Sequence, residues 1–239
     1  MKLKAVLFDL DGTLLPMDQN LFIHTYLQAL AAKLAPWGFD PKGVIRGIWA
    51  GTEAMVKNHG EISNREAFWD GCCRVLGDKL REQENLIEDF YRNEFQKVRH
   101  VCGFHAGAAE VVDLLKAKGV GRILATNPLF PAIATHSRVR WAGLAPEDFG
   151  WISTYENSRF SKPNPDYYRD LLKQNGLEPE ECLMVGNDVS EDMIAGTLGM
   201  DVFLLTDCII NPDNLDISPY PRGSFPELAA YLKTRTENE

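Results

Sequence analysis

The apolar run 6–8, Val-Leu-Phe, is followed directly by two aspartates, Asp9 and Asp11, and then by Gly12. A short apolar run between polar and turn residues is typical of a strand buried on both faces of a parallel sheet. Because the carboxylates are two residues apart, both can point to one side where the strand ends, and Gly12 lets the chain turn away. Neighbouring carboxylates repel each other unless a cation lies between them or one carries a proton. The pattern therefore indicates a site for a hard divalent metal and an anionic substrate.

Alone, an Asp-x-Asp-Gly pattern is equally compatible with an ordinary acidic turn. The flanking residues narrow the interpretation. The segment 9–14, Asp-Leu-Asp-Gly-Thr-Leu, lies directly after an apolar strand near the N-terminus and resembles the first motif of the haloacid dehalogenase superfamily. Most members of that superfamily are phosphatases. The resemblance implies that three further motifs follow in order along the chain.

The apolar residues 123–125 are followed by Thr126 and Asn127, again polar residues at the end of a predicted buried strand. A hydroxyl and backbone N–H groups at this point can hold a phosphate oxygen, although a Thr-Asn turn can also satisfy only its own backbone. In its order along the chain, the pattern matches the second motif of the superfamily. We therefore expect Thr126 and Asn127 to bind the substrate.

Lys162 belongs to the segment 161–167, Ser-Lys-Pro-Asn-Pro-Asp-Tyr, between a predicted strand and a predicted helix. A single loop lysine is usually solvated, but Lys-Pro-x-Pro is similar to the third motif of the superfamily. In that motif the lysine neutralises the nucleophile and the phosphate, and a rigid flank suits a flexible side chain that delivers a point charge. The resemblance implies that Lys162 is both catalytic and substrate-binding.

An acidic cluster at 187–192 follows the predicted strand 182–185. One carboxylate or amide of this cluster can complete the oxygen shell of Mg²⁺, which prefers octahedral geometry and keeps several waters. The cluster resembles the fourth motif, except that Asn187 stands where an aspartate is common. Either Asn187 ligates through its amide oxygen or Asp188 takes the position, while Asp192 ligates through water or orients the others. The expected metal ligands are Asp9, Asp11, Asn187, Asp188 and Asp192.

From residue 101 onward, predicted strands and helices alternate. Strands are expected at 121–125, 150–154, 182–185 and 202–205, and helices at 106–118, 165–175, 190–198 and 224–232. This alternation implies a parallel sheet covered on both faces, with its ligand crevice at the carboxyl ends of the strands. The predicted fold class is therefore α/β, a Rossmann-like doubly wound parallel sheet.

Between the first two motifs the sequence has helical periodicity and no predicted strand. Asp18, Asp40 and the capping box 63–66 mark three helix starts, and a fourth helix is expected over 82–98. The position of these helices matches the cap domain that the superfamily inserts between its first and second motifs. The resemblance thus implies two domains, a catalytic core over 1–16 and 101–239 and a helical cap over 17–100.

The cap is expected to start at the mouth of the crevice and to open and close over Asp9. The residues on it that are candidates for facing a substrate are His24, Trp49, Thr52, Glu53 and Lys57. Packing or solvation explains each of them at least as well, and Trp49 in particular is expected in the core of the helical bundle. The sequence therefore leaves the substrate unidentified.

Together the motifs imply a magnesium-dependent phosphatase that acts on a small phosphorylated metabolite. Asp9 attacks phosphorus to form an aspartyl-phosphate, and Asp11 protonates the leaving oxygen and then activates water. Mg²⁺, Lys162 and Thr126 spread the charge of the transferring group. A sugar phosphomutase of the same superfamily and a non-catalytic phosphometabolite-binding protein stay open as alternatives. A dehalogenase is disfavoured because it needs no metal and lacks the second aspartate.

Composition limits the partners further. The formal net charge of -9, without a compensating run of Lys and Arg, argues against nucleic-acid binding. No stretch approaches the length of a membrane span, and the first apolar run is too short for a signal peptide. The five cysteines show no Cys-x-x-Cys spacing, so neither a disulfide framework nor a zinc site is expected. We expect a cytoplasmic protein without membrane association, and the sequence leaves its oligomeric state open.

Overall fold

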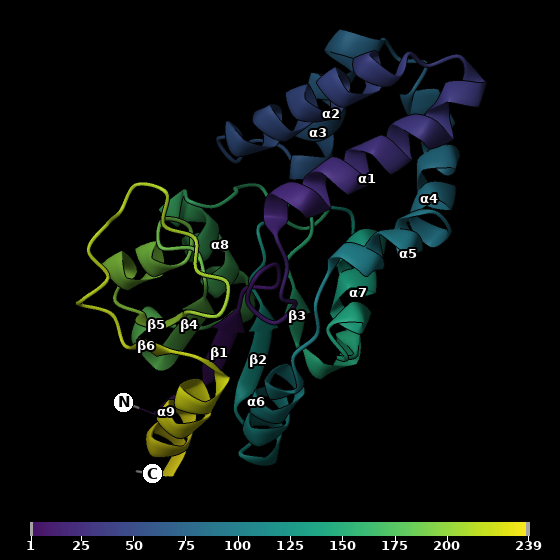
Figure 1. Ribbon diagram of the computed structural model, residues 1–239. Helices are drawn as coiled ribbons and strands as arrows, with labels where there is room; N and C mark the ends of the chain where they lie inside the picture. Colours follow the sequence, from purple (N-terminus) through teal and green to yellow (C-terminus); the bar gives the residue numbers. More distant parts are fainter. Residues whose placement is uncertain (1, 238–239) are drawn as a thin grey trace.

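A computed structural model describes residues 2–237, and in this part of the chain six parallel strands form one sheet (Figure 1). The strands are β1 (Ala5–Phe8), β2 (Gly121–Leu124), β3 (Trp151–Ile152), β4 (Cys182–Gly186), β5 (Asp201–Leu205) and β6 (Arg222–Gly223). Their order is β3-β2-β1-β4-β5-β6. The chain therefore reverses its direction of winding between β1 and β4, which is where ligands bind in open parallel sheets.

The register of the central strand brings three strand ends to the same level. Phe8 lies opposite Leu124 of β2 and Val185 of β4. The N–H of Asp9 donates to the Val185 carbonyl at 2.9 Å, and the N–H of Ala125 donates to the Phe8 carbonyl at 2.7 Å. The polar residues that follow these three strands consequently meet at one edge of the sheet.

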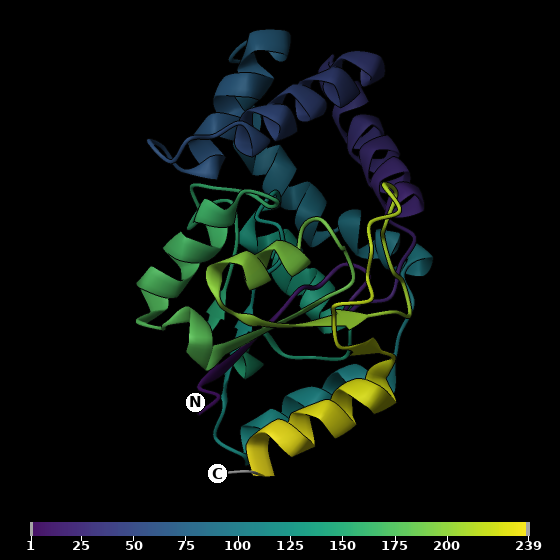
Figure 2. The ribbon, with the colours of Figure 1, turned by 90° about the vertical axis from the view of Figure 1, so that its left-hand side faces the viewer.

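Helices cover both faces of the sheet, which confirms the predicted doubly wound α/β fold (Figures 1 and 2). In β1, Val6 and Phe8 pack on the side of α6 and α9, whereas Ala5 and Leu7 pack on the side of α8. This alternation follows from the twofold period of a strand. Helices α6 and α9 lie side by side. The helices around the sheet are α6 (Ala106–Ala117), α7 (Ala132–Trp141), α8 (Pro165–Asn175) and α9 (Phe225–Glu237).

A second group of helices lies beyond the carboxyl ends of the strands (Figure 1). We call residues 17–100 the helical segment. It contains α1 (Gln19–Leu34), α2 (Pro41–Val56), α3 (Asn64–Leu76), α4 (Glu84–Arg92) and α5 (Phe95–Val98). As predicted, the side chains of Asp18, Asp40 and Ser63 cap α1, α2 and α3, and Ser63 forms its capping box with Glu66. These side chains accept hydrogen bonds from N–H groups that a first helical turn leaves unpaired.

The two stretches of chain that join the helical segment to the rest are hydrogen-bonded to each other. The N–H of Gly103 donates to the Pro16 carbonyl at 2.7 Å, and Met17 forms an antiparallel bridge with Cys102. A Cβ atom at Gly103 would lie 3.2 Å from the Pro16 oxygen, so the close approach favours glycine. The two connections thus run side by side.

The helix predicted over 82–98 is interrupted at Asn93. The side-chain amide of Asn93 donates to the Asp89 carbonyl at 3.1 Å and to the Asp89 carboxylate at 2.8 Å. Asparagine competes in this way with the backbone for hydrogen bonds. As a result α4 ends at Arg92 and α5 begins at Phe95.

The helix predicted over 190–198 is also shorter, because only Met193–Leu198 is helical, as the 3-10 turn η6. Asp188 Oδ1 accepts the N–H groups of Ser190 at 2.8 Å and Glu191 at 2.9 Å. These bonds hold the preceding residues in a separate turn, so the helical conformation starts later than predicted.

The remaining differences are small. The sequence does not predict α7 or β6, β3 is shorter than predicted, and α9 continues past 232 to Glu237. The other short turns are η1 (Ala35–Trp37), η2 (Arg81–Gln83), η3 (Arg99–Val101), η4 (Pro146–Asp148) and η5 (Pro179–Glu181). Across residues 2–237, no helix combines the length and the apolar character that crossing a membrane requires.

Candidate active site

Lys162 connects two carboxylates beside the ends of β1 and β4. Its Nζ lies 2.9 Å from Asp9 Oδ1 and 2.6 Å from Asp192 Oδ1. The lysine is only 1% exposed and Asp9 is 7% exposed. The structure therefore brings Lys162 and Asp9 together, as the sequence predicts, and it adds Asp192 as the second partner of the lysine.

The two carboxylates keep Lys162 charged. Burial lowers the pKa of Lys162, but the negative charges of Asp192 and Asp9 outweigh this effect and hold the pKa well above its ordinary value. Burial raises the pKa of the Asp192 carboxyl, against the opposing effect of Lys162. Buried charges persist in proteins when they are paired and hydrogen-bonded. The lysine is therefore a permanent cation next to the carboxylate at the end of β1.

Asp11 forms an ion pair with Arg138 of α7, whose side chain is completely buried. Arg138 also donates to Thr135 Oγ1 at 3.3 Å, and its guanidinium carbon lies 4.3 Å from the centre of the Phe130 ring. Within residues 2–237, Asp11 Oδ1 is buried without a hydrogen-bond partner. One oxygen of Asp11 is thus held by the arginine, and the other is available to a proton or a ligand.

Burial raises the pKa of the Asp11 carboxyl, Arg138 lowers it, and the charge of Asp9 raises it again, with a raised pKa as the net effect. A carboxyl with a raised pKa is suited to giving and taking protons near neutral pH. Arg138 is not among the residues predicted from the sequence, because α7 is not predicted either. The sequence nevertheless held one signal for a paired arginine. Ala134 and Val139 are apolar and lie close to Arg138 in the chain, and an arginine in apolar surroundings is almost never buried unless it is paired.

Asn127 lies in the loop that follows β2 and contacts Glu191. Like Arg138, Glu191 is a residue of the site that the sequence does not predict. The side-chain N–H₂ group of Asn127 donates to both carboxylate oxygens of Glu191, at 3.0 and 3.1 Å. Burial raises the pKa of Glu191 to about 7. The neighbouring Thr126 is buried, and its carbonyl accepts the hydroxyl of Tyr167 at 3.0 Å. The loop after β2 is therefore fixed from two sides.

Asn187 is fixed against the turn that follows β1. Its Oδ1 accepts the hydroxyl of Thr13 at 2.8 Å, and its Nδ2 donates to the Cys208 carbonyl at 2.7 Å. Gly12 has φ +90°, and a Cβ atom there would lie 2.4 Å from Asn187 Nδ2. Glycine is required at this position for both reasons. The amide oxygen of Asn187 consequently points toward the segment that carries the two aspartates.

The five expected metal ligands separate into two groups. Asp188 holds the turn after β4, and Asp192 accepts the Asp188 N–H at 2.9 Å in addition to binding Lys162. Asp9, Asp11 and Asn187 remain beside the end of β1. Within residues 2–237, no three His, Cys, Asp or Glu side chains are grouped so that they could share a metal ion. The oxygens beside the end of β1 are therefore those of two aspartates and one amide, and Asp11 Oδ1 has no hydrogen-bond partner in the described part of the chain.

Among the hydrogen bonds that join the helical segment to the loops beside the site are those of a buried amide that the sequence does not predict. The side-chain N–H₂ group of Asn64, the first residue of α3, lies 3.1 Å from the Phe160 carbonyl, 3.1 Å from Ser161 Oγ and 3.3 Å from the Pro128 carbonyl. These acceptors belong to the loops that follow β2 and precede α8. Any movement of the helical segment relative to the sheet must break these contacts.

Fold and site together define an α/β enzyme whose carboxylates and buried lysine lie at the carboxyl end of a parallel sheet. The chain belongs to the haloacid dehalogenase-like hydrolase family, whose model matches residues 3–198. The structure and the family match thus confirm the resemblance that the sequence motifs suggest. The protein is accordingly a hydrolase.

Individual relatives agree with this assignment. The chain is 28% identical over 212 residues to a phosphoglycolate phosphatase of Vibrio vulnificus strain YJ016, a match that covers 86% of this chain and 84% of that protein. It is 27% identical over 205 residues to hexitol phosphatase A of Escherichia coli K12, covering 83% and 78% of the two chains. Its fold is similar to the crystal structure of a HAD phosphatase from Thermococcus onnurineus, with a TM-score of 0.59, 20% identity and coverage of 97% and 98%.

Proposed function

We propose that this protein is a magnesium-dependent phosphatase that hydrolyses a small phosphorylated metabolite. The observation that carries the proposal is the buried Lys162 between Asp9 and Asp192, because it sets a permanent positive charge beside the carboxylate at the end of β1. The similarity to proteins named phosphoglycolate phosphatase and hexitol phosphatase supports the same class of reaction.

In the first step, a carboxylate oxygen of Asp9 attacks phosphorus. An aspartyl-phosphate bond forms, and the bond between phosphorus and the leaving oxygen breaks. Asp11 gives its proton to the leaving oxygen, a role for which a pKa raised by burial is suited. Lys162 offsets the negative charge that gathers between Asp9 and the phosphoryl oxygens.

In the second step, the deprotonated Asp11 accepts a proton from water. The water oxygen attacks phosphorus, the bond to Asp9 breaks, and inorganic phosphate leaves with the Asp9 carboxylate restored. Thr126 and the adjacent backbone N–H groups are assigned to the phosphoryl oxygens, and Asn127 keeps this loop in place through Glu191. Asp11 thereby regains the proton that it gave to the leaving oxygen, and the phosphoryl group ends on the oxygen of water.

We assign the magnesium site to Asp9 and the amide oxygen of Asn187, because the one free side-chain oxygen of Asp11 is assigned to the proton. Bound Mg²⁺ would neutralise charge on the phosphoryl oxygens and align them for attack. The two hydrogen bonds that fix the Asn187 amide support this choice over Asp188, whose Oδ1 already accepts two backbone N–H groups.

We further propose that the helical segment, 17–100, is a cap domain that opens and closes over the core formed by 1–16 and 101–239. The paired connections at Pro16 and Gly103 support a hinge at this point, and the Asn64 contacts support a latch. Limited proteolysis should cut preferentially near the two connections. Beryllium fluoride with magnesium should protect them, and unchanged cleavage would contradict the hinge.

The reaction is tested by hydrolysis of p-nitrophenyl phosphate with and without magnesium. We expect turnover that needs the metal and disappears in Asp9→Asn. Phosphate binding without turnover would favour a non-catalytic phosphometabolite-binding protein. Turnover that persists in Asp9→Asn would reject the mechanism.

A further inference from the structure

We propose that Tyr167 is a positioning residue for the phosphatase reaction: its hydroxyl holds the peptide group between Thr126 and Asn127 so that the Asn127 N–H faces a phosphoryl oxygen. The inference rests on the proposed function, which assigns Thr126 and the adjacent backbone N–H groups to the phosphoryl oxygens. Tyr167 is buried and lies in the first turn of α8. Its hydroxyl donates to the Thr126 carbonyl at 3.0 Å. The contact thus joins the helix that follows Lys162 to the loop after β2.

The Tyr167 hydroxyl takes the place that an N–H of β3 would have in a longer sheet. Along β2, alternate carbonyls point to β3, because the backbone groups of a strand point to its two neighbours in turn. The Leu124 carbonyl accepts the Ser153 N–H at 2.9 Å, and the Thr126 carbonyl is the next one on the same side. Strand β3 has ended by that point. The phenol therefore extends the hydrogen bonding of β2 by one step.

The other half of the same peptide group points to β1. The peptide bond between Thr126 and Asn127 is trans, so its C=O and N–H point in opposite directions. On this side of β2, the Ala125 N–H donates to the Phe8 carbonyl at 2.7 Å, and the Asn127 N–H is the next in the series. The corresponding carbonyl of Leu10 accepts N–H groups of its own turn instead. The Asn127 N–H therefore faces the turn that carries the two aspartates.

This N–H is left without an acceptor. Within residues 2–237 the side chain and the carbonyl of Asn127 are hydrogen-bonded, whereas its backbone N–H donates to no other group. Backbone N–H groups of folded proteins are almost always paired. An unpaired one beside the ends of β1 and β2 is available to an anionic oxygen from outside the chain, to which it would donate a charge-assisted hydrogen bond. A phosphoryl oxygen fits this description.

Ser153 keeps the Tyr167 proton directed at Thr126. The Tyr167 oxygen lies 2.9 Å from Ser153 Oγ, and all three residues are buried. A phenol has one proton and a carbonyl can only accept, so the Tyr167 proton goes to Thr126 and the Ser153 hydroxyl donates to the Tyr167 oxygen. Burial raises the pKa of Tyr167, so the phenol keeps its proton. Hydrogen bonds in such a chain strengthen one another.

The first test is Tyr167→Phe, assayed with p-nitrophenyl phosphate and magnesium. Phosphoryl oxygens are charged before and during the transfer, so a misplaced donor weakens substrate binding more than it slows the chemical step. We expect KM and the inhibition constant of inorganic phosphate each to rise about tenfold, the scale of one hydrogen bond, with a smaller change in kcat. A merely structural role would lower kcat by reducing the folded fraction and leave KM unchanged. That result, or wild-type constants, would overturn the inference.

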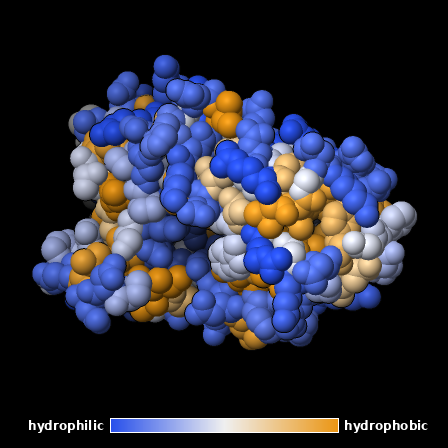
Figure 3. All heavy atoms as spheres, turned by 90° about the horizontal axis from the view of Figure 1, so that it is seen from above, coloured by the Kyte–Doolittle hydropathy of each residue, from blue (hydrophilic) through white to orange (hydrophobic). Residues whose placement is uncertain are grey.

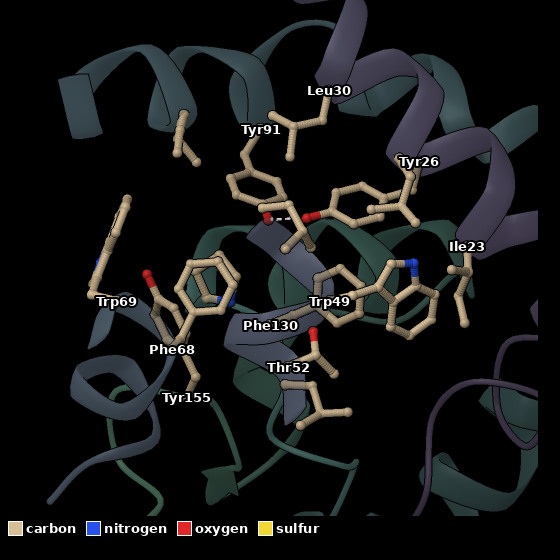
Figure 4. A pocket seen from close by; sticks show the side chains of 15 residues that line it. Ile23, Tyr26, Leu30, Trp49, Thr52, Phe68, Trp69, Tyr91, Phe130 and Tyr155 are labelled. Atoms are coloured by element: carbon tan, nitrogen blue, oxygen red, sulfur yellow. Dashed lines mark hydrogen bonds between the residues drawn. The ribbon is translucent and has the colours of Figure 1, made fainter. Parts of the chain in front are cut away.

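The matched control is Tyr91→Phe, which removes another buried phenol hydroxyl. The hydroxyls of Tyr91 and Tyr26 are hydrogen-bonded to each other at 3.0 Å (Figure 4). Both side chains line an apolar cavity of about 130 Å³ between the helical segment and the loop after β2, and of the described residues none that is assigned to the reaction lines it. Tyr91→Phe should therefore leave KM and the phosphate inhibition constant unchanged. An equal rise of KM in both variants would overturn the inference.

The same cavity corrects one expectation from the sequence. Trp49 lines it from α2 and is 49% exposed, so the expectation that Trp49 belongs to the core of the bundle is wrong. The molecule seen from above is hollowed, with hydrophobic atoms exposed among hydrophilic ones (Figure 3). One edge of the cavity is thus open to solvent, unlike the buried chain of hydrogen bonds from Ser153 to Thr126.

Ser153→Ala supplies a second variant if Tyr167→Phe does not fold. The phenol can still donate to Thr126 but loses the group that directs it, so KM should rise only about two- to threefold. In Tyr167→Phe the Ser153 hydroxyl has no phenol to bind, so the double variant should be no weaker than Tyr167→Phe alone. Independent, multiplying effects on KM would overturn the chain of hydrogen bonds, and so would wild-type constants in folded Ser153→Ala.

A third measurement does not depend on turnover. Inorganic phosphate, added with magnesium, should shift the amide-proton resonance of Asn127 downfield, because the N–H then donates to a charged oxygen. The shift should be smaller in Tyr167→Phe than in Tyr91→Phe. An Asn127 resonance that does not move while phosphate saturates the site would overturn the inference.

Failure of the inference can be told apart from failure of the proposed function. If the wild-type protein hydrolyses no ester with magnesium and binds no phosphate, the proposed function fails and the inference with it. If the wild-type protein is active and folded Tyr167→Phe keeps the wild-type KM and phosphate inhibition constant, only the inference fails.

Discussion

The charged site at the end of the sheet and the apolar cavity of about 130 Å³ lined by Trp49, Thr52 and Phe130 are built in opposite ways. At the sheet, buried charges are matched with opposite charges, as Lys162 is with Asp9 and Asp192 and Arg138 is with Asp11. The lining of the cavity instead contains aromatic and aliphatic side chains without a charge. The charged site suits the part that all phosphate esters share. Changes in this site should therefore affect all substrates alike.

The largest effect is expected from Asp9→Asn, which removes the proposed nucleophile. Turnover should fall by at least about 10⁴-fold for every ester, because no covalent intermediate can form. Phosphate release from several esters measures this loss. A loss confined to one class of ester would contradict a role of Asp9 that all substrates share.

The next largest effect is expected from Asp11→Asn. Without the acid, turnover should fall by roughly 10²- to 10⁴-fold. A phosphorylated enzyme should still accumulate with p-nitrophenyl phosphate, because that leaving group needs little protonation. Rapid-quench measurement of the protein-bound phosphoryl group separates the two steps. Absence of the intermediate under these conditions would argue against separate roles for the two aspartates.

Arg138→Met tests the residue that stands between the charged site and the cavity. Leaving Asp11 without its cation should destabilise the fold by about 3 kcal/mol. Arg138 lowers the pKa of Asp11, so its removal raises that pKa, and the limb of the pH–rate profile that reports Asp11 should move to higher pH. An acid with a raised pKa in the folded state binds more protons there than in the unfolded state, so stability falls as pH rises.

Stability of Arg138→Met should therefore decrease with pH more steeply than that of the wild-type protein. Thermal unfolding between pH 5 and pH 8, together with rates over the same range, measures both effects. Arg140→Met is the matched control, because Arg140 lies on the same helix and is exposed. Equal pH dependence in both variants would show that the ion pair does not tune Asp11.

The smallest effect concerns the metal. Asn187→Asp adds a charge to the proposed magnesium site and should lower the magnesium concentration needed for activity about tenfold, a shift that survives partial screening and dehydration. It also replaces the donor to the Cys208 carbonyl by a carboxylate, which should reduce stability by about 1–3 kcal/mol. Asp188→Asn should leave the magnesium requirement unchanged. The opposite pattern in a magnesium titration would identify Asp188 as the ligand.

Prediction from sequence succeeded where local patterns decide the structure. The apolar run of β1, the proline and asparagine before α8 and the capping residues Asp18 and Asp40 each specify a conformation with near neighbours in the chain. The alternation of strands and helices then fixes the layers and places the polar residues at one edge of the sheet. The meeting of Lys162 with Asp9 was expected from the resemblance of 162–165 to the third motif of the superfamily.

Residues whose importance depends on distant partners were missed. Arg138 binds Asp11 across 127 positions in the sequence, and Asn64 lies against Phe160 across 96. In the cluster after β4, Asp188 and Asp192 accept different backbone N–H groups. Only the folded structure shows that Asp188 holds the turn and that Asp192 binds Lys162. The wall of the cavity was likewise unpredictable, because an aromatic residue at helical spacing is usually core.

Because β1 lies between β2 and β4, the active site at the ends of these three strands can form only late in the synthesis of the chain. The first strand to leave the ribosome pairs with β2 and with β4, and Lys162 lies 153 positions after Asp9, while Asn187 lies 174 positions after Thr13. The bundle of α1 to α4 depends on nearer contacts and can form first, because short loops close at a lower entropy cost than long ones. A nascent chain therefore holds a folded bundle beside an apolar strand that lacks one of its two neighbours until β4 emerges. Pausing of translation before residue 182 would prolong that exposure and favour aggregation.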